Sequence, residues 1–319
     1  MYDVVALGEL LIDFTCLSVD AEGYPTMAAH PGGAPANYLA ALTKYGAKTA
    51  LIGKVGNDAF GKLLIGTLRG AGIDTRAMRI ADDYFTTLAF VTLDSSGDRE
   101  FSFARKPGAD TQLCEDELDL AAIDEARVLH FGTLSLTDEP ARSATYKAVQ
   151  HARAQGKLIS FDPNLRKPLW RDLDEAKRQM LWGLAHADVV KISDEEVDFL
   201  FGMSAQEGAA KLLEDYPIKT VFVTCGAEGC HYAGRGAGQG FAESLRGIKV
   251  ADTTGAGDIF GGAAMAMLLR AGKAPEALSA DELDGIVRFA CTAAGLSTTR
   301  AGGISAVPEY DEVMQRLGK

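Results

Sequence analysis

The chain has 319 residues, of which 47% are hydrophobic and 24% charged, a composition typical of a globular protein with a large core. Its net charge of −12 excludes a broad nucleic-acid-binding surface, because a phosphate backbone requires a basic one. The five cysteines are scattered and none is spaced as Cys-x-x-Cys, so neither a disulfide framework nor a zinc site is expected. With no run of about 18 apolar residues and no leader-like N-terminus, we expect a soluble, cytoplasmic protein without a membrane partner.

Short apolar runs alternate with amphipathic stretches along the chain. The apolar runs predict buried strands at residues 4–7, 49–52, 128–131, 158–161, 189–192 and 220–224. The amphipathic stretches predict helices at residues 36–45, 60–70, 141–155 and 173–185, and the chain is mostly helical in pattern from residue 255 onward. This alternation predicts an α/β fold with a mainly parallel central sheet flanked by helices, and ligands at the carboxyl ends of the strands.

Two segments interrupt this alternation. Residues 11–30 lack a strong helical pattern, and residues 86–105 have the pattern of two strands joined by a turn at residues 94–98. We expect these segments to form a small β-sheet lid inserted in a single domain that spans residues 1–319. Because Leu88, Phe90 and Val91 make the lid apolar and exposed strands invite edge pairing, we also expect a homodimer through the lid.

The segment 252–258 has the sequence Asp-Thr-Thr-Gly-Ala-Gly-Asp and precedes an apolar helical run. Glycines leave backbone N–H groups uncovered, and a helix N-terminus carries about half a positive charge, so this turn favours an anion, most often a phosphate. Asp258 stands where the anion would bind. It either caps the helix or takes a proton from a group that attacks the anion, and the turn alone favours neither.

Polar clusters follow most of the other predicted strands. Asp13 follows the first strand, Gly32 and Gly33 precede the first predicted helix and Asn37 lies at its start, and further clusters occupy residues 160–166, 193–196 and 224–229. Each cluster alone fits an ordinary loop. Together they predict a ligand site, because the carboxyl ends of parallel strands meet at one edge of a sheet.

Two glycine motifs point to other enzyme classes but are incomplete. Gly56 to Lys62 has the glycine and lysine spacing of a phosphate-binding P-loop, but Leu63 stands where a Ser or Thr should hold Mg²⁺. The pair Gly255 and Gly257 lacks the third glycine of a dinucleotide-binding turn, because Phe260 stands there. We therefore reject both a P-loop enzyme and a nicotinamide dehydrogenase.

Two segments give the sequence a resemblance to the ribokinase-like, PfkB-type carbohydrate kinases. The first is Gly-Gly-Ala-Pro-Ala-Asn at residues 32–37, followed by Gly46 and by Val-Gly-Asn-Asp-Ala-Phe-Gly at residues 55–61, and the second is the turn at residues 252–258. The resemblance extends over essentially the whole chain and is strongest to bacterial fructokinases. It implies a ribokinase-like fold and ATP-dependent phosphorylation of a sugar hydroxyl.

The resemblance also implies a role for each matching position. Asp258 becomes the catalytic base, and the N–H groups of Gly255, Ala256 and Gly257 hold the transferring phosphoryl group. The implied sugar contacts are Asp13, Gly32, Gly33, Asn37, Arg105 and Arg166. The implied nucleotide contacts are Lys191, Thr224, Gly226, Gly229, Thr254 and Gly257.

The metal positions follow from the same resemblance. Glu196 matches the acidic residue that organises Mg²⁺ through water, and Asp252 and Thr254 lie where some members bind K⁺. The chain departs from the family in having Ser193 where Asn is usual before this glutamate, and Cys291 where Asn is frequent near the adenine. The first departure weakens any contact of residue 193 with phosphate or metal.

Three functions remain open from the sequence. The loops around Asp13, Asn37 and Arg166 resemble those of fructokinases, which implies phosphorylation of D-fructose to fructose 6-phosphate. The 2-keto-3-deoxygluconate kinases share Arg105 and Arg166, which can pair with a substrate carboxylate. A sugar- or nucleotide-binding protein without turnover is the third alternative, and the intact Asp258 and Gly-Ala-Gly turn argue against it.

Overall fold

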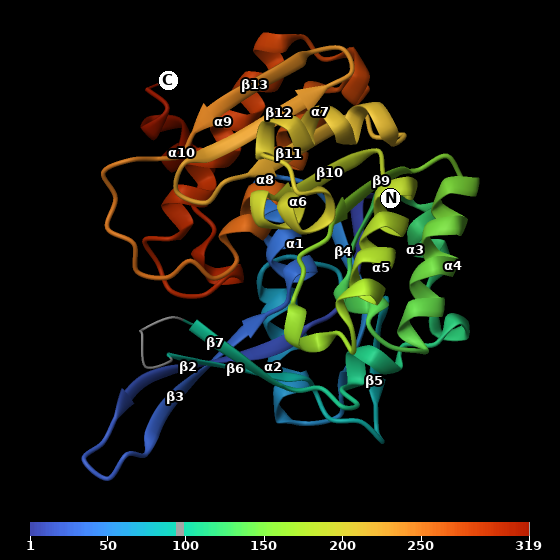
Figure 1. Ribbon diagram of the computed structural model, residues 1–319. Helices are drawn as coiled ribbons and strands as arrows, with labels where there is room; N and C mark the ends of the chain where they lie inside the picture. Colours follow the sequence, from blue (N-terminus) through green and yellow to red (C-terminus); the bar gives the residue numbers. More distant parts are fainter. Residues whose placement is uncertain (94–98, 319) are drawn as a thin grey trace.

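The computed structural model of the protein describes residues 1–93 and 99–318, and the turn predicted at residues 94–98 lies outside the described residues. The main sheet has nine strands in the order β13-β12-β11-β10-β9-β8-β1-β4-β5 (Figure 1). Their bounds are β1 Tyr2–Leu7, β4 Thr49–Gly56, β5 Met78–Ala81, β8 Ala126–Gly132, β9 Leu158–Asp162, β10 Val189–Ser193, β11 Thr220–Thr224, β12 Gly229–Gly234 and β13 Gly238–Glu243. The strands from β11 to β5 pair in parallel, and β12 at the other end of the sheet pairs antiparallel with both β11 and β13.

The parallel strands are apolar on both faces because helices cover both. Side chains alternate across a strand, so Val4 and Ala6 of β1 enter one hydrophobic core while Val5 and Leu7 enter the other. The first core is covered by α1 Ala34–Lys44, α2 Ala59–Gly70, α8 Ala256–Ala271, α9 Ala280–Ser297 and α10 Tyr310–Arg316. The second is covered by α3 Leu120–Asp124, α4 Ala141–Ala154, α5 Leu173–His186, α6 Asp194–Phe201 and α7 Ala205–Asp215. The predicted α/β architecture is confirmed.

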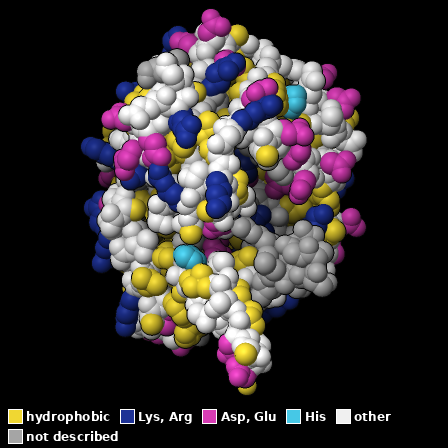
Figure 2. Space-filling model, turned by 90° about the vertical axis from the view of Figure 1, so that its left-hand side faces the viewer, with side chains coloured by type: hydrophobic (Ala, Val, Ile, Leu, Met, Phe, Trp, Pro, Cys, Tyr) yellow, Lys and Arg dark blue, Asp and Glu magenta, His cyan; other side chains and the backbone are white. Residues whose placement is uncertain are grey.

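The two interrupting segments form a separate four-stranded sheet, which we call the lid. It consists of β2 Leu11–Val19, β3 Pro25–Gly32, β6 Leu88–Leu93 and β7 Arg99–Ala104, in the order β3-β2-β6-β7. The β2–β3 hairpin projects away from the main body (Figure 1). On the same side of the molecule, hydrophobic side chains gather around the base of the projecting segment and at its tip (Figure 2).

The prediction that Leu88, Phe90 and Val91 lie on an exposed strand available for pairing is wrong. Strand β6 lies inside the lid sheet between β2 and β7, so it offers no free edge. Val91 is buried, and Leu88 and Phe90 are half-buried, with the Phe90 ring stacked on that of Phe14. The edges of the lid are β3 and β7, and among the lid side chains whose burial the structure describes, the exposed large apolar ones are instead Leu17, Val19 and Tyr24 of the hairpin.

The segments that carry Arg166, Glu196 and Gly226 follow the carboxyl ends of β9, β10 and β11, as the α/β pattern predicts, whereas Asp13 lies in β2 and Asp258 in α8. In the described ranges 1–93 and 99–318, no helix has the length and apolar character needed to span a bilayer.

Candidate active site

Helix α8 begins without a side-chain cap among the described residues. Its N-cap, Gly255, adopts φ +73°. A Cβ at Gly255 would lie 3.0 Å from both Asn37 Nδ2 and Gly303 Cα, so a larger residue would be strained as well as crowded. The amides of Gly255, Ala256 and Gly257 at this helix end therefore form a candidate anion hole, in which the N–H of Ala256 also donates to the carbonyl oxygen of Thr253 at 3.3 Å.

Asp258 does not act as the helix cap, which settles the geometric question raised by the turn. It lies in the first turn of α8 and is buried, and its Oδ2 accepts a hydrogen bond of 2.9 Å from Nδ2 of Asn37 on α1. Burial raises the pKa of Asp258, whereas the charges of Lys191 and Arg166 and the hydrogen bond from Asn37 lower it. The carboxylate is thus fixed by one donor and made more basic than an exposed aspartate.

The lid supplies a second carboxylate, Asp13, from β2. Burial raises the pKa of Asp13 to about 7; the Arg166 charge lowers it, and Asp258 and Asp252 raise it further. A Cβ at Gly32 would overlap Asp13 Oδ2, so only glycine leaves the carboxylate its place. The predicted positions Asp13, Gly32, Asn37 and Arg166 therefore gather around Asp258.

Gly33 serves the same region by its backbone. It is the N-cap of α1 with φ +117°, and a Cβ there would lie 2.6 Å from the carbonyl oxygen of Glu9. Glycine is therefore required for β3 to turn into the helix that presents Asn37.

A buried ion pair underlies the anion hole. Nζ of Lys191, on β10, lies 3.1 Å from Oδ2 of Asp162, at the end of β9. Burial alone would lower the pKa of Lys191, but the charges of Asp162, Glu196 and Asp258 outweigh it and raise the pKa. A Cβ at Gly257 would lie 3.0 Å from the Lys191 ammonium, which places this cation directly against the first turn of α8.

A cavity of ≈ 560 Å³ opens on the other side of this helix terminus. Its size suits a small-molecule ligand. The predicted nucleotide positions that line it are Thr224, Gly226, Gly229 and Gly257, together with Ala256 of the anion hole. Most of its apolar wall comes from residues that the sequence did not identify: Leu245, Ile248, Val250, Phe260 and Ala294.

The residues predicted to hold metal ions are engaged by the protein itself. Oε1 of Glu196 accepts from the N–H of Leu165 at 2.6 Å and Oε2 from that of Ser193 at 2.8 Å. Asp252 accepts from Thr254, through both its N–H and hydroxyl, and from Gly302 N–H. In the part of the chain that the structure describes, no group of three or more His, Cys, Asp or Glu side chains is arranged to hold a metal ion.

Arg105 is the predicted sugar residue that lies apart from this group. Its Nε and Nη2 lie 2.8 Å and 2.7 Å from Oδ2 of Asp110. Nη1 donates to Thr137 Oγ1 and Nη2 to the carbonyl oxygen of Leu134, both at 2.8 Å. All three guanidinium nitrogens thus have protein partners, and a direct contact with sugar stays a prediction.

These features define a class of protein. A helix N-terminus that no described side chain caps lies between a ligand-sized cavity and the buried carboxylate of Asp258. The positive charges of Lys191 and Arg166 act on that carboxylate. This is the arrangement that phosphoryl transfer from a nucleotide to a small acceptor requires, because that reaction depends on positioning and on charge stabilisation. Fold and site together are those of a small-molecule kinase.

Comparison with known proteins identifies the family. The family model of the pfkB family carbohydrate kinases matches residues 1–310, and the chain belongs to that family. It is 40% identical to fructokinase-1 of Zea mays, over 99% of this chain and 98% of the relative.

Solved structures agree. Fructokinase with bound ATP from Xylella fastidiosa is 30% identical, with a TM-score of 0.89 over 100% of this chain and 99% of that chain. Fructokinase from Vibrio cholerae O395, in a form with bound fructose, ADP and calcium ion, is 31% identical, with a TM-score of 0.85 over 99% of both chains. The expected resemblance to fructokinases is confirmed, although the identity is higher to the plant enzyme than to these two bacterial ones.

Proposed function

We propose that this carbohydrate kinase transfers the γ-phosphoryl group of ATP to D-fructose and forms fructose 6-phosphate, with Asp258 as the base. The observation that carries the proposal is the position of Asp258. It is a buried carboxylate held by Asn37, and it directly follows Ala256 and Gly257, which line the ≈ 560 Å³ cavity. A nucleotide in that cavity would direct its phosphates at the α8 N-terminus, next to Asp258.

Asp258 would accept the proton that the attacking sugar hydroxyl loses. The sugar oxygen attacks the γ-phosphorus while its proton passes to the carboxylate of Asp258, and the bond from phosphorus to the bridging β,γ-oxygen breaks to release ADP. Asn37 holds Oδ2 of Asp258, which leaves Oδ1 for the proton. Burial supports this role, because the raised pKa of Asp258 brings a carboxylate closer to the range of an effective base.

The anion hole and Lys191 would stabilise the transferring group. The amides of Gly255, Ala256 and Gly257 point out of a helix end that carries partial positive charge. Lys191 lies against the same turn and is held by Asp162, so its ammonium needs little reorganisation to oppose the growing charge on the phosphoryl oxygens.

The residues present fit Mg²⁺ that is bound mainly by the nucleotide. Mg²⁺ commonly keeps several waters and takes few protein ligands besides substrate phosphates. Glu196, fixed by two backbone donors, would orient such waters, and the metal would neutralise the β- and γ-phosphates. A double mutant of the V. cholerae fructokinase was solved with fructose, ADP and a potassium ion, and we propose that K⁺ would bind this chain near Asp252 and Thr254.

Fructose is favoured over a keto-acid substrate by the charges of the site. A sugar acid requires a cation for its carboxylate, and Arg105 is already bound to Asp110, Thr137 and Leu134. Arg166 alone would face such a carboxylate, in competition with Asp13 and Asp258. Hydroxyl groups of a neutral sugar, by contrast, can donate to both carboxylates.

The proposal is tested by measuring ADP release with a coupled assay on fructose, 2-keto-3-deoxygluconate, ribose, adenosine and tagatose 6-phosphate. We expect turnover to be highest with fructose. A higher kcat/KM for 2-keto-3-deoxygluconate would reject fructose and retain the kinase. If none of the five acceptors gives turnover, the remaining alternative is a sugar- or nucleotide-binding protein without catalytic activity.

A further inference from the structure

The chain crosses between the main body and the lid four times, and buried polar contacts tie these crossings together. Residues 8–10 lead into β2, Gly33 leads from β3 into α1, residues 86–87 lead into β6, and Arg105 follows β7. We call the group formed by Glu9, Thr87, Arg105 and Asp110 the lid root.

Asp110 joins the third and fourth crossings. One of its oxygens accepts a short hydrogen bond from the hydroxyl of Thr87, and the other accepts from Arg105. The side chains of Arg105 and Asp110 are each only 2% exposed. Arg105 continues to Thr137 and Leu134, which belong to the main body, so the end of the lid is fixed to the layer beneath it.

Glu9 joins the first and second crossings. Its side chain is buried, and Oε1 accepts from the N–H of Ala34, the first residue of α1, at 2.8 Å. Burial raises the pKa of Glu9 to about 7; Arg105 lowers it and Asp110 raises it, so the two halves of the root interact electrostatically. Asp110 therefore links two crossings through Thr87 and Arg105, and Glu9 links the other two through Ala34.

The root connects the lid part of the sugar site to the main-body part. Asp13 is carried by β2, four residues after Glu9, whereas Asn37 lies one turn after Ala34 on α1. A shift of Glu9 against Ala34 would therefore change the separation between Asp13 and the Asn37–Asp258 pair. A buried ion pair is weak evidence for a stabilising role, and its hydrogen bonds to two crossings suit it to fixing geometry.

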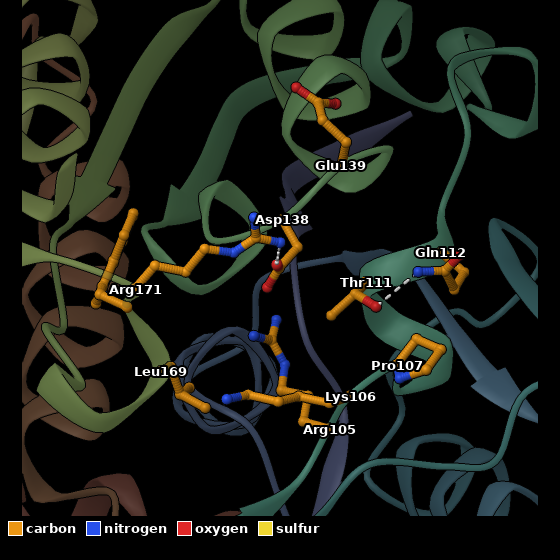
Figure 3. A pocket seen from close by; sticks show the side chains of 10 residues that line it. Arg105, Lys106, Pro107, Thr111, Gln112, Asp138, Glu139, Leu169 and Arg171 are labelled. Carbon is orange, nitrogen blue, oxygen red and sulfur yellow. Dashed lines mark hydrogen bonds and ion pairs between the residues drawn. The ribbon is translucent and has the colours of Figure 1, made fainter.

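The surroundings of Arg105 allow its substitution without a steric clash. The root borders a cavity of ≈ 380 Å³, where Arg105 lies beside Lys106, and Arg171 pairs with Asp138 at 3.4 Å (Figure 3). The side chain of Arg171 is 89% exposed, so this arginine lines the same cavity but lies outside the root. It is a matched control for Arg105.

We propose that Arg105 is a positioning residue for the sugar site: through Asp110, Thr87 and Glu9 it sets the lid, and with it Asp13, over Asn37 and Asp258. The inference deepens the proposed function, since it assumes that the sugar binds between these groups. It assigns Arg105 an indirect effect on sugar binding in place of the direct contact that the sequence predicts.

The test compares Arg105→Lys and Asp110→Asn with the control Arg171→Lys. We measure kcat and KM for fructose, the dissociation constant of ATP, and hydrogen exchange of the amides in β2 and β3. The two root variants should raise the KM about tenfold, as expected for loss of a charge-assisted hydrogen bond, with kcat recovered at saturating sugar. Both root variants should also speed hydrogen exchange of the amides in β2 and β3, although none of the hydrogen bonds described for the Arg105 side chain reaches these strands. They should leave the ATP affinity unchanged. The control Arg171→Lys should change neither the KM for fructose nor the exchange.

Two outcomes would overturn the proposal. If Arg105→Lys raises the KM while Asp110→Asn does not, and exchange in β2 and β3 stays slow, then Arg105 contacts the sugar directly. If exchange rises equally in β9 and β10, the pair only stabilises the whole protein. Absence of any fructose turnover in the unmodified protein would instead refute the proposed function, while exchange would still report on the root.

Discussion

Asp258 illustrates at the scale of one residue how burial and a single donor convert a common helix-start residue into a candidate base. The hydrogen bond from Asn37 fixes its orientation, and burial raises its pKa. An Asp258→Asn change keeps the shape and an oxygen acceptor for Asn37 but removes the base. We expect kcat to fall about 10²- to 10⁴-fold, with ATP and fructose affinities little changed.

Steady-state kinetics and calorimetric binding would check this expectation. Asp281→Asn is the control, because Asp281 also lies in the first turn of a helix, α9, but is exposed. If kcat of Asp258→Asn equals that of the unmodified protein, the carboxylate has no role in proton transfer.

The charge of Arg166 predicts a specific pH dependence. Arg166 lowers the pKa of both Asp13, which lies at about 7, and Asp258. Both carboxylates work in their charged forms, so kcat/KM for fructose should fall as the pH drops through about 7. An Arg166→Gln change removes the opposing charge and raises both pKa values, which moves this acidic limb to higher pH.

The pH–rate profile of Arg166→Gln is compared with that of Lys167→Gln, an exposed neighbour. The position of the limb is the measurement, since a simple loss of sugar affinity would lower the whole profile without moving it. An unmoved limb in Arg166→Gln would show that Arg166 does not interact with the titrating carboxylate.

At the scale of elements, α8 is capped at each end by a glycine with left-handed backbone, and only one of the two lies at the site. Gly255 has φ +73° and lies against Asn37 and Gly303, whereas Gly272 has φ +68° and no atoms within 4 Å of the position that a Cβ would occupy. Replacing either by alanine should lower the free energy of unfolding by about 1–2 kcal/mol, the cost of this conformation for an L-residue. Only Gly255→Ala should also lower kcat.

Denaturant unfolding and kinetics on the two variants separate these effects, and Gly272→Ala provides the matched control. If both variants keep full kcat, the conformation of Gly255 is a helix boundary and contributes nothing to the anion hole.

Which elements could be predicted depended on local signals. Six of the parallel strands and four helices were predicted because buried strands are continuously apolar and helices repeat at 3.6 residues, whereas the short parallel strand β5 was missed. The start of α6 was missed although its signal was present: Ser193 and Glu196 form a capping box, a pattern visible in the sequence. Glu196, expected to organise a metal, therefore also starts a helix.

The parts of the site that escaped prediction depend on contacts between distant segments. Leu245 and Ile248 line the cavity from a stretch without regular structure, where no periodicity exists to identify them. The Lys191–Asp162 pair depends on β9 and β10 being neighbours in the sheet, and the partners of Arg105 depend on how the lid returns to the main body. Sequence spacing alone contains none of these distances.

At the scale of the whole molecule, the site requires both sheets. Asp13 comes from the lid, whereas Asn37, Arg166 and Asp258 come from the main body, so the separation of the two parts determines whether the site is complete. The lid is a four-stranded sheet with two edges and an apolar projecting hairpin. The described residues of the other lid strands do not cover the apolar side chains of this hairpin.

This exposure predicts that two copies associate through the hairpin. Leu17, Val19 and Tyr24 are 65%, 61% and 70% exposed, and burying them against a second lid would remove apolar surface from water. We expect light scattering after size exclusion to give a dimer, and the double change Leu17→Ser with Tyr24→Ser to give a monomer with a higher KM for fructose, since a loosened lid displaces Asp13. Ile80→Ser is the control, because Ile80 is 61% exposed on the edge strand β5 of the main sheet. A monomeric unmodified protein at high concentration, or equal loss of the dimer in the control, would exclude the hairpin as the interface.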